Sequence, residues 1–141
     1  MRRAGKAEFE PKTSSRNHRS KLLPVAMRDL WPMAMNTVYT DIDPTRAELD
    51  ALEGAAVVEF GSPWCGYCRA AQPLIAAAFA SHPQVRHIKI EDGSGRALGR
   101  SFAVKLWPTL VFLRNGKEIA RLVRPRDASA IGKALAKIEL V

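Results

Sequence analysis

Apolar residues form a regular series of short runs between residue 36 and the end of the 141-residue chain. Runs of strand length that are apolar, β-branched or alternating in polarity predict β-strands at 36–40, 55–60, 85–90, 110–113 and 118–123. Helical spacing of apolar residues predicts α-helices at 44–53, 65–80, 96–101 and 128–138. The predicted order of elements is therefore β-α-β-α-β-α-β-β-α, which indicates an α/β fold.

Capping and turn residues mark the ends of several of these elements. Asp43 is the predicted N-cap of the first helix, and Asp127 is that of the last helix. Asn115-Gly116 predicts a tight hairpin, so the last two strands should run antiparallel. The apolar run at 55–60 suits a strand covered on both faces, as in a parallel sheet, whereas 85–90 alternates as a half-buried strand. We expect a central mixed β-sheet flanked by helices.

Positive charge is concentrated at the start of the chain, because residues 1–35 contribute five of the eight net charges. This polar stretch predicts a flexible N-terminal extension to a single domain at 36–141. A basic tail can bind nucleic acid or anionic lipid, but a solvated tail is the commoner case and we expect neither partner. No apolar run reaches the roughly 18–20 residues of a membrane span, and no export signal is visible. We therefore expect a cytoplasmic monomer.

Both cysteines of the chain, Cys65 and Cys68, lie in the sequence Trp-Cys-Gly-Tyr-Cys. This C-x-x-C spacing is used by redox dithiols, by zinc sites and by haem attachment sites. Haem attachment requires a histidine after the second cysteine, where this chain has Arg69. A structural zinc site requires about four Cys or His ligands, and no second ligand pair at metal spacing is present. A redox dithiol remains, and we expect no bound metal or other cofactor.

The dithiol follows a predicted strand and begins a predicted helix. The unpaired N–H groups and partial positive charge of a helix N-terminus favour a thiolate at Cys65, and the thiolate is the nucleophile of disulfide exchange. Cys68 follows one helical turn later, so its sulfur can reach that of Cys65. We expect Cys65 to attack a partner disulfide and Cys68 to resolve the mixed disulfide, forming a reversible Cys65–Cys68 disulfide. An inert cysteine pair is the alternative.

Glu59 is the single charged residue of the apolar run that precedes the dithiol. A lone buried carboxylate is costly and has a raised pKa. Glu59 is therefore predicted to exchange protons near pH 7 and to deprotonate Cys68. Lys89, on the neighbouring strand, is predicted to pair with Glu59. The open alternatives are an exposed Glu59 at a strand edge and a solvated Lys89.

Pro108 precedes a predicted buried strand, a position where proline demands special geometry. A cis Trp107–Pro108 bond would bring this loop beside the cysteines and leave the backbone of Trp107 free to pair with an extended substrate. The sequence does not assign the isomer, since most X–Pro bonds are trans. Trp64, Tyr67 and Trp107 are candidates for an apolar rim around the sulfurs, with ordinary core positions as the alternative.

Taken together, these motifs resemble the thioredoxin superfamily of thiol-disulfide oxidoreductases. The similar stretch covers roughly residues 36–140 and includes VVEFGSPWCGYCRAAQP, Lys89 and WPTLVFLRNGKEIARLV. The resemblance implies the thioredoxin fold and a protein-disulfide reductase that acts on disulfide-containing proteins. It also implies electrons supplied by a thioredoxin-reductase-like flavoprotein that uses NADPH.

The resemblance further implies roles for single residues. It makes Cys65 the nucleophile and Cys68 the resolving thiol, and it places Glu59 and Lys89 at the buried acid and its lysine partner. The family's cis-proline and helix-kinking proline correspond to Pro108 and Pro73. The implied substrate-binding surface comprises Trp64, Gly66, Tyr67, Trp107, Pro108 and Thr109.

Four positions depart from the family pattern. Gly66-Tyr67 replaces the usual Gly-Pro between the cysteines, which favours a more oxidising potential. Glu59 replaces aspartate, Trp107 replaces a small aliphatic residue, and Arg124 replaces a glycine that lets partners approach closely. These departures leave two other functions open: a disulfide oxidase or isomerase, and a docking module that uses the fold without catalysis.

Overall fold

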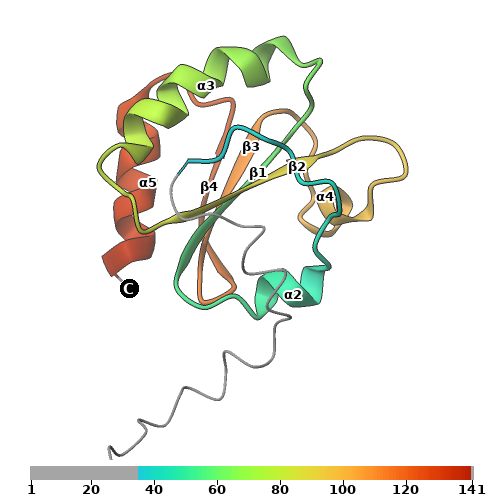
Figure 1. Cartoon of the computed structure of the whole chain (residues 1–141), viewed down its shortest axis with the longest axis horizontal. Coiled ribbons are helices and arrows are strands. Elements are labelled where there is room, and N and C mark those ends of the chain that lie inside the picture. The colour runs from blue at the N-terminus through green and yellow to red at the C-terminus, as the bar shows by residue number, and fades with distance from the viewer. Residues whose placement is uncertain (1–34, 141) are drawn as a thin grey trace, which may run out of the picture.

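Four strands form one mixed sheet in the computed structural model, which describes residues 35–140 (Figure 1). The strands are β1 (Ala55–Gly61), β2 (Arg86–Glu91), β3 (Thr109–Arg114) and β4 (Lys117–Val123), in the order β2-β1-β3-β4. β1 pairs with β2 in parallel and with β3 antiparallel, and β3 pairs antiparallel with β4. The predicted mixed sheet is confirmed. The predicted N-terminal extension at 1–35 lies, apart from Met35, outside the described residues.

Helices cover both faces of this sheet (Figure 1). The short helices α2 (Arg46–Asp50) and α4 (Ala97–Ser101) pack on one face, and the longer helices α3 (Gly66–Phe79) and α5 (Ala128–Leu140) pack on the other. A separate apolar cluster fills the space between the sheet and each helical layer. The predicted architecture of a sheet flanked by helices is therefore confirmed, with Pro73 inside α3.

The side chains of β1 alternate between the two clusters because successive residues of a strand point to opposite faces. Val58 and Phe60 pack on the side of α2 and α4, whereas Val57 faces α3 and α5. Glu59, two residues after Val57, consequently lies on the face that α3 covers. The parallel register pairs Glu59 with Lys89, which brings a second charged residue to the same place.

The expectation of a half-buried strand at 85–90 is wrong, because the four central residues of β2 are all buried. Ile88 and Ile90 join the apolar cluster on one face. His87 and Lys89 share the opposite face, which the alternation in the sequence predicts to be exposed to solvent. Both polar side chains instead find a buried partner in Glu59. An alternating strand can therefore be buried on both faces when its polar residues are paired.

Thr45 caps α2, so the prediction of Asp43 as the N-cap is wrong. The Thr45 hydroxyl accepts a hydrogen bond from the Glu48 N–H at 3.1 Å, and the helix begins at Arg46. Asp43 instead faces Arg96, with 3.4 Å between the carboxylate and the guanidinium. At the last helix the prediction is confirmed, since Asp127 accepts the Ala130 N–H at 2.8 Å.

The predicted strand at 36–40 is reduced to a single bridge between Tyr39 and Lys89. The Thr40 N–H donates to the Lys89 carbonyl at 3.0 Å, but no regular ladder follows within the described residues. This segment nevertheless runs along β2 and carries Tyr39 to the side chain of Lys89, whose Nζ lies 4.6 Å from the ring centroid.

The predicted hairpin at Asn115-Gly116 is confirmed, because these two residues alone connect β3 to β4. Both have positive φ angles, 49° and 78°, as the favoured two-residue turns require. A Cβ atom on Gly116 would collide with the backbone of Asp50, so this turn also packs against the end of α2. Among the described residues, no helix is both long and apolar enough to cross a membrane.

Candidate active site

Cys65 is the N-cap residue of α3, where the extended backbone of the preceding loop turns into the helix. Its sulfur accepts a hydrogen bond from the Cys68 N–H at 3.2 Å. Its own N–H donates to the Ser62 carbonyl at 3.2 Å, which fixes the loop before the helix. A sulfur that accepts a backbone N–H at a helix N-terminus is suited to carry negative charge. The predicted strand-to-helix placement is confirmed.

Cys68 is 2% exposed, whereas Cys65 is partly accessible, and both are free thiols. Burial raises the pKa of the Cys68 thiol to about 12, with further contributions from its hydrogen bond to Cys65 and from the negative charges of Cys65 and Glu59. Cys68 is therefore protonated at neutral pH while the dithiol is reduced. The two sulfurs differ sharply in access, as an attacking thiol and a resolving thiol should.

Gly61 leaves the space that the Cys68 sulfur occupies. A Cβ atom on Gly61 would lie 2.7 Å from the Cys68 sulfur and 3.2 Å from the Tyr39 hydroxyl. Any side chain at this position would displace the sulfur or the phenol. The end of β1 thus needs glycine for a close approach, because Gly61 itself has an ordinary backbone conformation.

Glu59 is fully buried and lies in a polar cluster behind Cys68. Its carboxylate accepts hydrogen bonds from His87 Nε2 at 2.8 Å and from Gln72 Nε2 at 3.0 Å, and Lys89 Nζ lies 3.8 Å away. We call Glu59, His87, Gln72 and Lys89 the buried polar cluster. The predicted pairing of Glu59 with Lys89 is present, and the exposed alternatives for both residues are wrong.

The hydrogen bonds of His87 define its tautomer. Its Nδ1 accepts the backbone N–H of Asn36 at 2.8 Å, so this nitrogen carries no proton. The proton is on Nε2, which donates it to the carboxylate of Glu59. The ring of His87 stacks on that of Phe79 with 4.9 Å between the centroids.

The pKa of Glu59 is lowered, although burial alone raises it, because His87, Lys89 and Gln72 all stabilise the charged form. The prediction of a raised pKa assumed a lone carboxylate and is wrong. Glu59 is ionised at neutral pH and its negative charge lies behind the resolving thiol.

Sequence reasoning missed Gln72 and His87. Gln72 links the buried polar cluster to the resolving cysteine, because its Nε2 also donates to the Cys68 carbonyl at 2.9 Å and its Oε1 accepts from Lys89 at 3.0 Å. Two signals were available in the sequence. Gln72 lies four residues after Cys68 on the same face of the helix, and His87 lies two residues before Lys89 on the same face of the strand.

A cavity of about 250 Å³ lies beside the buried polar cluster, with Tyr39, Cys68, Gln72 and Lys89 among its lining residues. Burial, together with the negative charges nearby, raises the pKa of Tyr39, so the phenol remains a hydrogen-bond donor. The cavity therefore brings the resolving thiol, the phenol of Tyr39 and the side chains of Gln72 and Lys89 to one opening.

The Trp107–Pro108 peptide bond is cis and lies opposite the cysteines. The Trp107 carbonyl oxygen is 4.0 Å from the Cys65 sulfur, as expected if this loop faces the dithiol. The Trp107 indole N–H donates to Asp92 at 2.9 Å, which holds the side chain against the end of β2. Thr109 is buried, and its hydroxyl donates to the Leu106 carbonyl at 2.6 Å.

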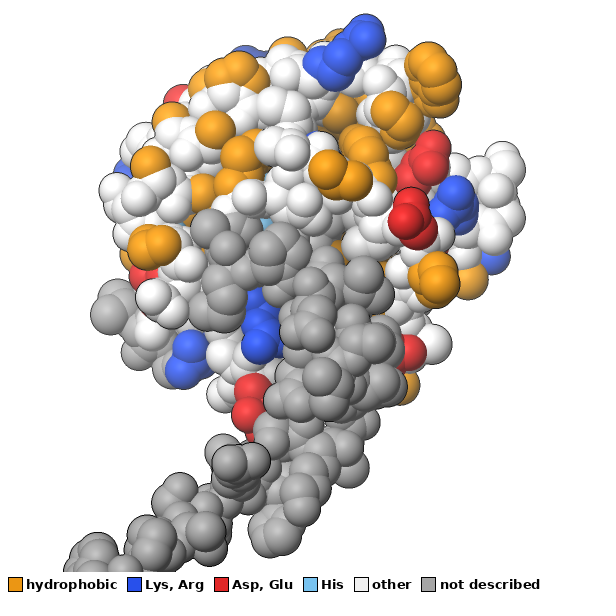
Figure 2. All heavy atoms as spheres, viewed as in Figure 1, with side chains coloured by type: hydrophobic (Ala, Val, Ile, Leu, Met, Phe, Trp, Pro, Cys, Tyr) orange, Lys and Arg blue, Asp and Glu red, His pale blue; other side chains and the backbone are white. Residues whose placement is uncertain are grey.

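The predicted apolar rim is only partly a free surface. Trp64 is 85% exposed and Tyr67 is 60% exposed, which is unusual for large aromatic side chains. Hydrophobic side chains gather over the start of α3 in the space-filling view (Figure 2). Trp107, by contrast, is half-buried and anchored by Asp92. Gly66 meets no neighbouring atom where a Cβ would lie, so packing does not require glycine there.

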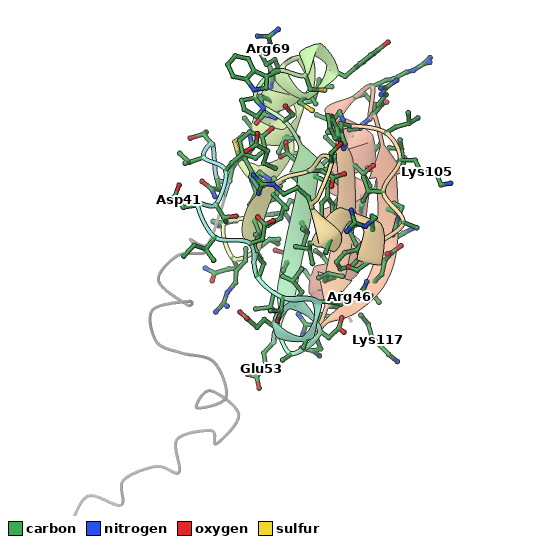
Figure 3. All side chains as sticks on the ribbon, turned by 90° about the vertical axis from the view of Figure 1, so that its right-hand side faces the viewer. Asp41, Arg46, Glu53, Arg69, Lys105 and Lys117 are labelled. Carbon is green, nitrogen blue, oxygen red and sulfur yellow. The ribbon has the colours of Figure 1, made fainter. Side chains whose placement is uncertain are left out.

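Arg69 directly follows the dithiol and lies at the end of the domain opposite Glu53 and Lys117 (Figure 3). Among the described residues, no group of three or more His, Cys, Asp or Glu could hold a metal ion. An accessible sulfur at a helix N-terminus, a buried thiol one turn later and a cis-proline loop facing both are the parts that dithiol exchange needs. This fold and this site define a thiol-disulfide oxidoreductase.

Comparisons with known proteins agree with this assignment. The thioredoxin family profile matches residues 40–137. The reduced thioredoxin 2 of Pseudomonas aeruginosa has a similar structure, with a TM-score of 0.66 and 57% sequence identity, over 74% of this chain and 96% of that chain. A Chlamydia trachomatis thioredoxin is 30% identical over 84 residues, which cover 60% of this chain and 82% of the relative.

A domain of human protein disulfide-isomerase A2 is also similar, at 38% identity over 87 residues, or 57% of this chain and 17% of that protein. The chain belongs to the thioredoxin family and has the thioredoxin fold. Its redox centre is the Cys65–Cys68 pair, and its activity is that of a protein-disulfide reductase.

Proposed function

We propose that Cys65 is the attacking thiol and Cys68 the resolving thiol in the reduction of protein disulfides. The observation that carries this assignment is the contrast between the two sulfurs. The Cys65 sulfur is accessible and accepts the Cys68 N–H, whereas Cys68 is buried and has a raised pKa. Only Cys65 is therefore both accessible to a protein substrate and placed as the N-cap of a helix, where negative charge on sulfur is stabilised.

The reaction is a pair of thiol-disulfide exchanges. The Cys65 thiolate attacks one sulfur of the substrate disulfide, forms a mixed disulfide and releases the first substrate thiolate. Cys68 then loses its proton and attacks the Cys65 sulfur, which breaks the mixed disulfide and releases the second substrate thiolate. Both substrate thiolates take up protons, so the substrate gains two electrons and the protein is left with a Cys65–Cys68 disulfide.

Formation of the mixed disulfide makes Cys68 easier to deprotonate. Two of the influences that raise the pKa of Cys68 are its hydrogen bond to Cys65 and the negative charge of Cys65. Both disappear when the Cys65 sulfur is bonded to substrate, because that sulfur then carries no charge. The resolving thiol is therefore activated after the first exchange and remains protonated before it.

Glu59 and Lys89 act on Cys68 through Gln72 in this proposal. Gln72 is hydrogen-bonded to the Glu59 carboxylate, to Lys89 Nζ and to the Cys68 carbonyl, so the buried polar cluster sets the position of the resolving thiol. Glu59 accepts the Cys68 proton only transiently, because its lowered pKa favours the ionised carboxylate.

The substrate segment binds in the angle between the start of α3 and the cis-proline loop. Exposed aromatic surface at Trp64 and Tyr67 supports this placement. The cis-proline loop at Trp107, Pro108 and Thr109 lies on the other side of the substrate segment, and the space beside Gly66 is open.

We further propose that an NADPH-dependent flavoprotein of the thioredoxin-reductase type returns electrons to the Cys65–Cys68 disulfide. A reductant of this kind works where thiols are kept reduced, which supports the cytoplasm as its compartment. The working unit is a monomer, with residues 36–141 as the catalytic domain and the basic segment 1–35 before it.

The test is reduction of insulin disulfides by the wild-type protein, Cys65→Ser and Cys68→Ser, with dithiothreitol or an NADPH-coupled flavoprotein reductase as donor. Cys65→Ser should be inactive, and Cys68→Ser should accumulate a mixed disulfide with the substrate that mass spectrometry detects. Trapping by Cys65→Ser in place of Cys68→Ser would reverse the two roles. Equal activity in all three proteins would refute the dithiol mechanism.

A disulfide isomerase or oxidase is the second candidate, favoured by the similarity to a domain of protein disulfide-isomerase A2 and by Gly66-Tyr67 between the cysteines. The reduction potential of the Cys65–Cys68 pair separates the two functions. A value near that of thioredoxin, about −270 mV, supports a reductase. A value of about −180 to −120 mV supports an isomerase or an oxidase.

A further inference from the structure

The side chain of Arg124 is hydrogen-bonded to the Trp107 carbonyl, a backbone acceptor of the cis-proline loop that faces Cys65. Its Nε donates to the Trp107 carbonyl at 2.9 Å, and the same oxygen is 4.0 Å from the Cys65 sulfur. An extended substrate beside Cys65 would need this carbonyl as its first hydrogen-bond acceptor on that side. The guanidinium therefore competes with the substrate backbone at the point of attack.

Two further contacts hold Arg124 in this position. Its backbone N–H donates to the Pro108 carbonyl at 2.9 Å, and its guanidinium carbon lies 3.9 Å from the centroid of the Tyr67 ring. Its φ angle is 49°, in the left-handed region that favours glycine. A bulky side chain at such a backbone position is disfavoured, so its contacts with Tyr67 and Trp107 must offset that cost.

A pocket of about 550 Å³ opens beside Arg124. Its lining residues include the largely apolar Tyr67, Leu74, Leu106 and Val123, together with Arg124 and Arg126. Among the described residues, no Asp or Glu lines the pocket, and the carboxylates nearby are those of Asp127, which follows Arg126 in the chain, and Asp92, which binds the Trp107 indole. The pocket next to the dithiol therefore combines apolar area with two arginine side chains.

We propose that Arg124 is a specificity-determining residue that selects disulfides flanked by an acidic residue. A substrate carboxylate beside the target cysteine binds the Arg124 guanidinium, and an adjacent apolar side chain fills the pocket over Leu74 and Leu106. The guanidinium then leaves the Trp107 carbonyl, which accepts a hydrogen bond from the substrate backbone. A carboxylate suits this place because a planar guanidinium binds it through two parallel hydrogen bonds.

A basic residue at the same place in a substrate would meet Arg124 and Arg126 without a partner. Like charges that face each other across an interface lower the rate of encounter and the stability of the complex. The proposal rests on the function proposed above, and it adds the class of protein substrate that this dithiol prefers.

The test uses two peptides that share one intramolecular disulfide and an adjacent leucine, and that differ only in a Glu or a Lys beside the attacked cysteine. The measured quantity is kcat/KM for the reduction of each peptide by the wild-type protein, Arg124→Gln, Arg124→Lys and Arg126→Gln. The wild type should prefer the Glu peptide by about five- to tenfold at about 20 mM salt. The preference should fall toward one at about 500 mM salt, where charges at the surface are screened.

Arg124→Gln should lose most of the preference for the Glu peptide, and Arg124→Lys should keep part of it. Partial retention in the lysine variant would show that the charge at position 124, and not a folding defect, is responsible for the preference. Arg126→Gln is the matched control, because Arg126 lines the same pocket but donates no hydrogen bond to the Trp107 carbonyl among the described residues. It should keep most of the preference.

Equal kcat/KM for the two peptides in the wild type would overturn the inference and leave the reductase function intact. Loss of the preference in Arg126→Gln but not in Arg124→Gln would overturn the assignment to Arg124. Failure of the wild type to reduce either peptide would instead count against the proposed dithiol mechanism.

Discussion

Replacement of His87 by leucine should strongly destabilise the reduced protein. His87 is fully buried, and its Nε2–H donates to the ionised Glu59 at 2.8 Å. A hydrogen bond to a charged group is worth about 1.5–3 kcal/mol. His87→Leu also leaves the Asn36 N–H without its acceptor, at a cost of about 1 kcal/mol.

The expected loss is therefore about 2.5–4 kcal/mol in the free energy of unfolding at pH 7, measured by guanidinium chloride denaturation of the reduced protein. For a domain of this size such a loss lowers Tm by about 15 °C. His87→Gln should lose less, because an amide N–H can replace the donor to Glu59.

A double-mutant cycle separates the hydrogen bond from the loss of packing against Phe79. Glu59→Leu alone leaves the His87 Nε2–H without an acceptor and Lys89 without its buried counter-charge, so it should also be destabilising. The double variant His87→Leu/Glu59→Leu replaces a polar pair by an apolar pair. Its loss in the free energy of unfolding should be smaller, by at least about 2 kcal/mol, than the sum of the losses in the two single variants. Additive losses, within about 0.5 kcal/mol, would refute the proposed coupling of His87 to the Glu59 charge.

Two further predictions concern the resolving thiol. Gly61→Ala places a Cβ 2.7 Å from the Cys68 sulfur and should displace that sulfur. The mixed disulfide should therefore form at a near-normal rate but be resolved at least about tenfold more slowly. Rapid-quench trapping with a labelled peptide measures both steps, and equal slowing of the two would contradict the reasoning. The second prediction concerns alkaline pH. Burial raises the pKa of Cys68 from 9.0 to about 12, so its contribution to the stability of the reduced protein is complete below pH 9 and is lost as pH rises toward 12. Between pH 9 and about pH 10.5, the free energy of unfolding of the reduced wild type should fall by up to about 2 kcal/mol more than that of Cys68→Ala, as measured by denaturant titration. If the two proteins show the same dependence of stability on pH, Cys68 is not buried as a neutral thiol.

The order of elements follows from the sequence because most of the chain obeys local rules. Strand runs, helical spacing and the Asn115-Gly116 turn each depend on residues that are close together in the chain. The failures occur where a distant residue takes part. Asp43 faces Arg96 in place of the helix terminus, and the segment at 36–40 forms a single bridge to β2, a strand that follows much later in the chain.

The site was predictable to the extent that its chemistry lies in contiguous motifs. Cys65, Cys68 and Pro108 belong to two short segments, and the fold brings those segments together as the family resemblance implies. The pKa of Glu59 was not predictable in this way. Its direction depends on partners from α3 and β2, and burial alone gives the opposite sign.

The departures from the family pattern are physically coupled to one another. Arg124 packs over Tyr67, the residue that replaces proline between the cysteines, and its Nε binds the carbonyl of Trp107. The Trp107 indole is in turn anchored by Asp92, beside the end of β2. A change at position 67 would therefore alter the support of Arg124 as well as the redox potential of the dithiol. For this protein, the dipeptide between the cysteines and the recognition of substrate beside them form one structural unit and cannot be varied independently.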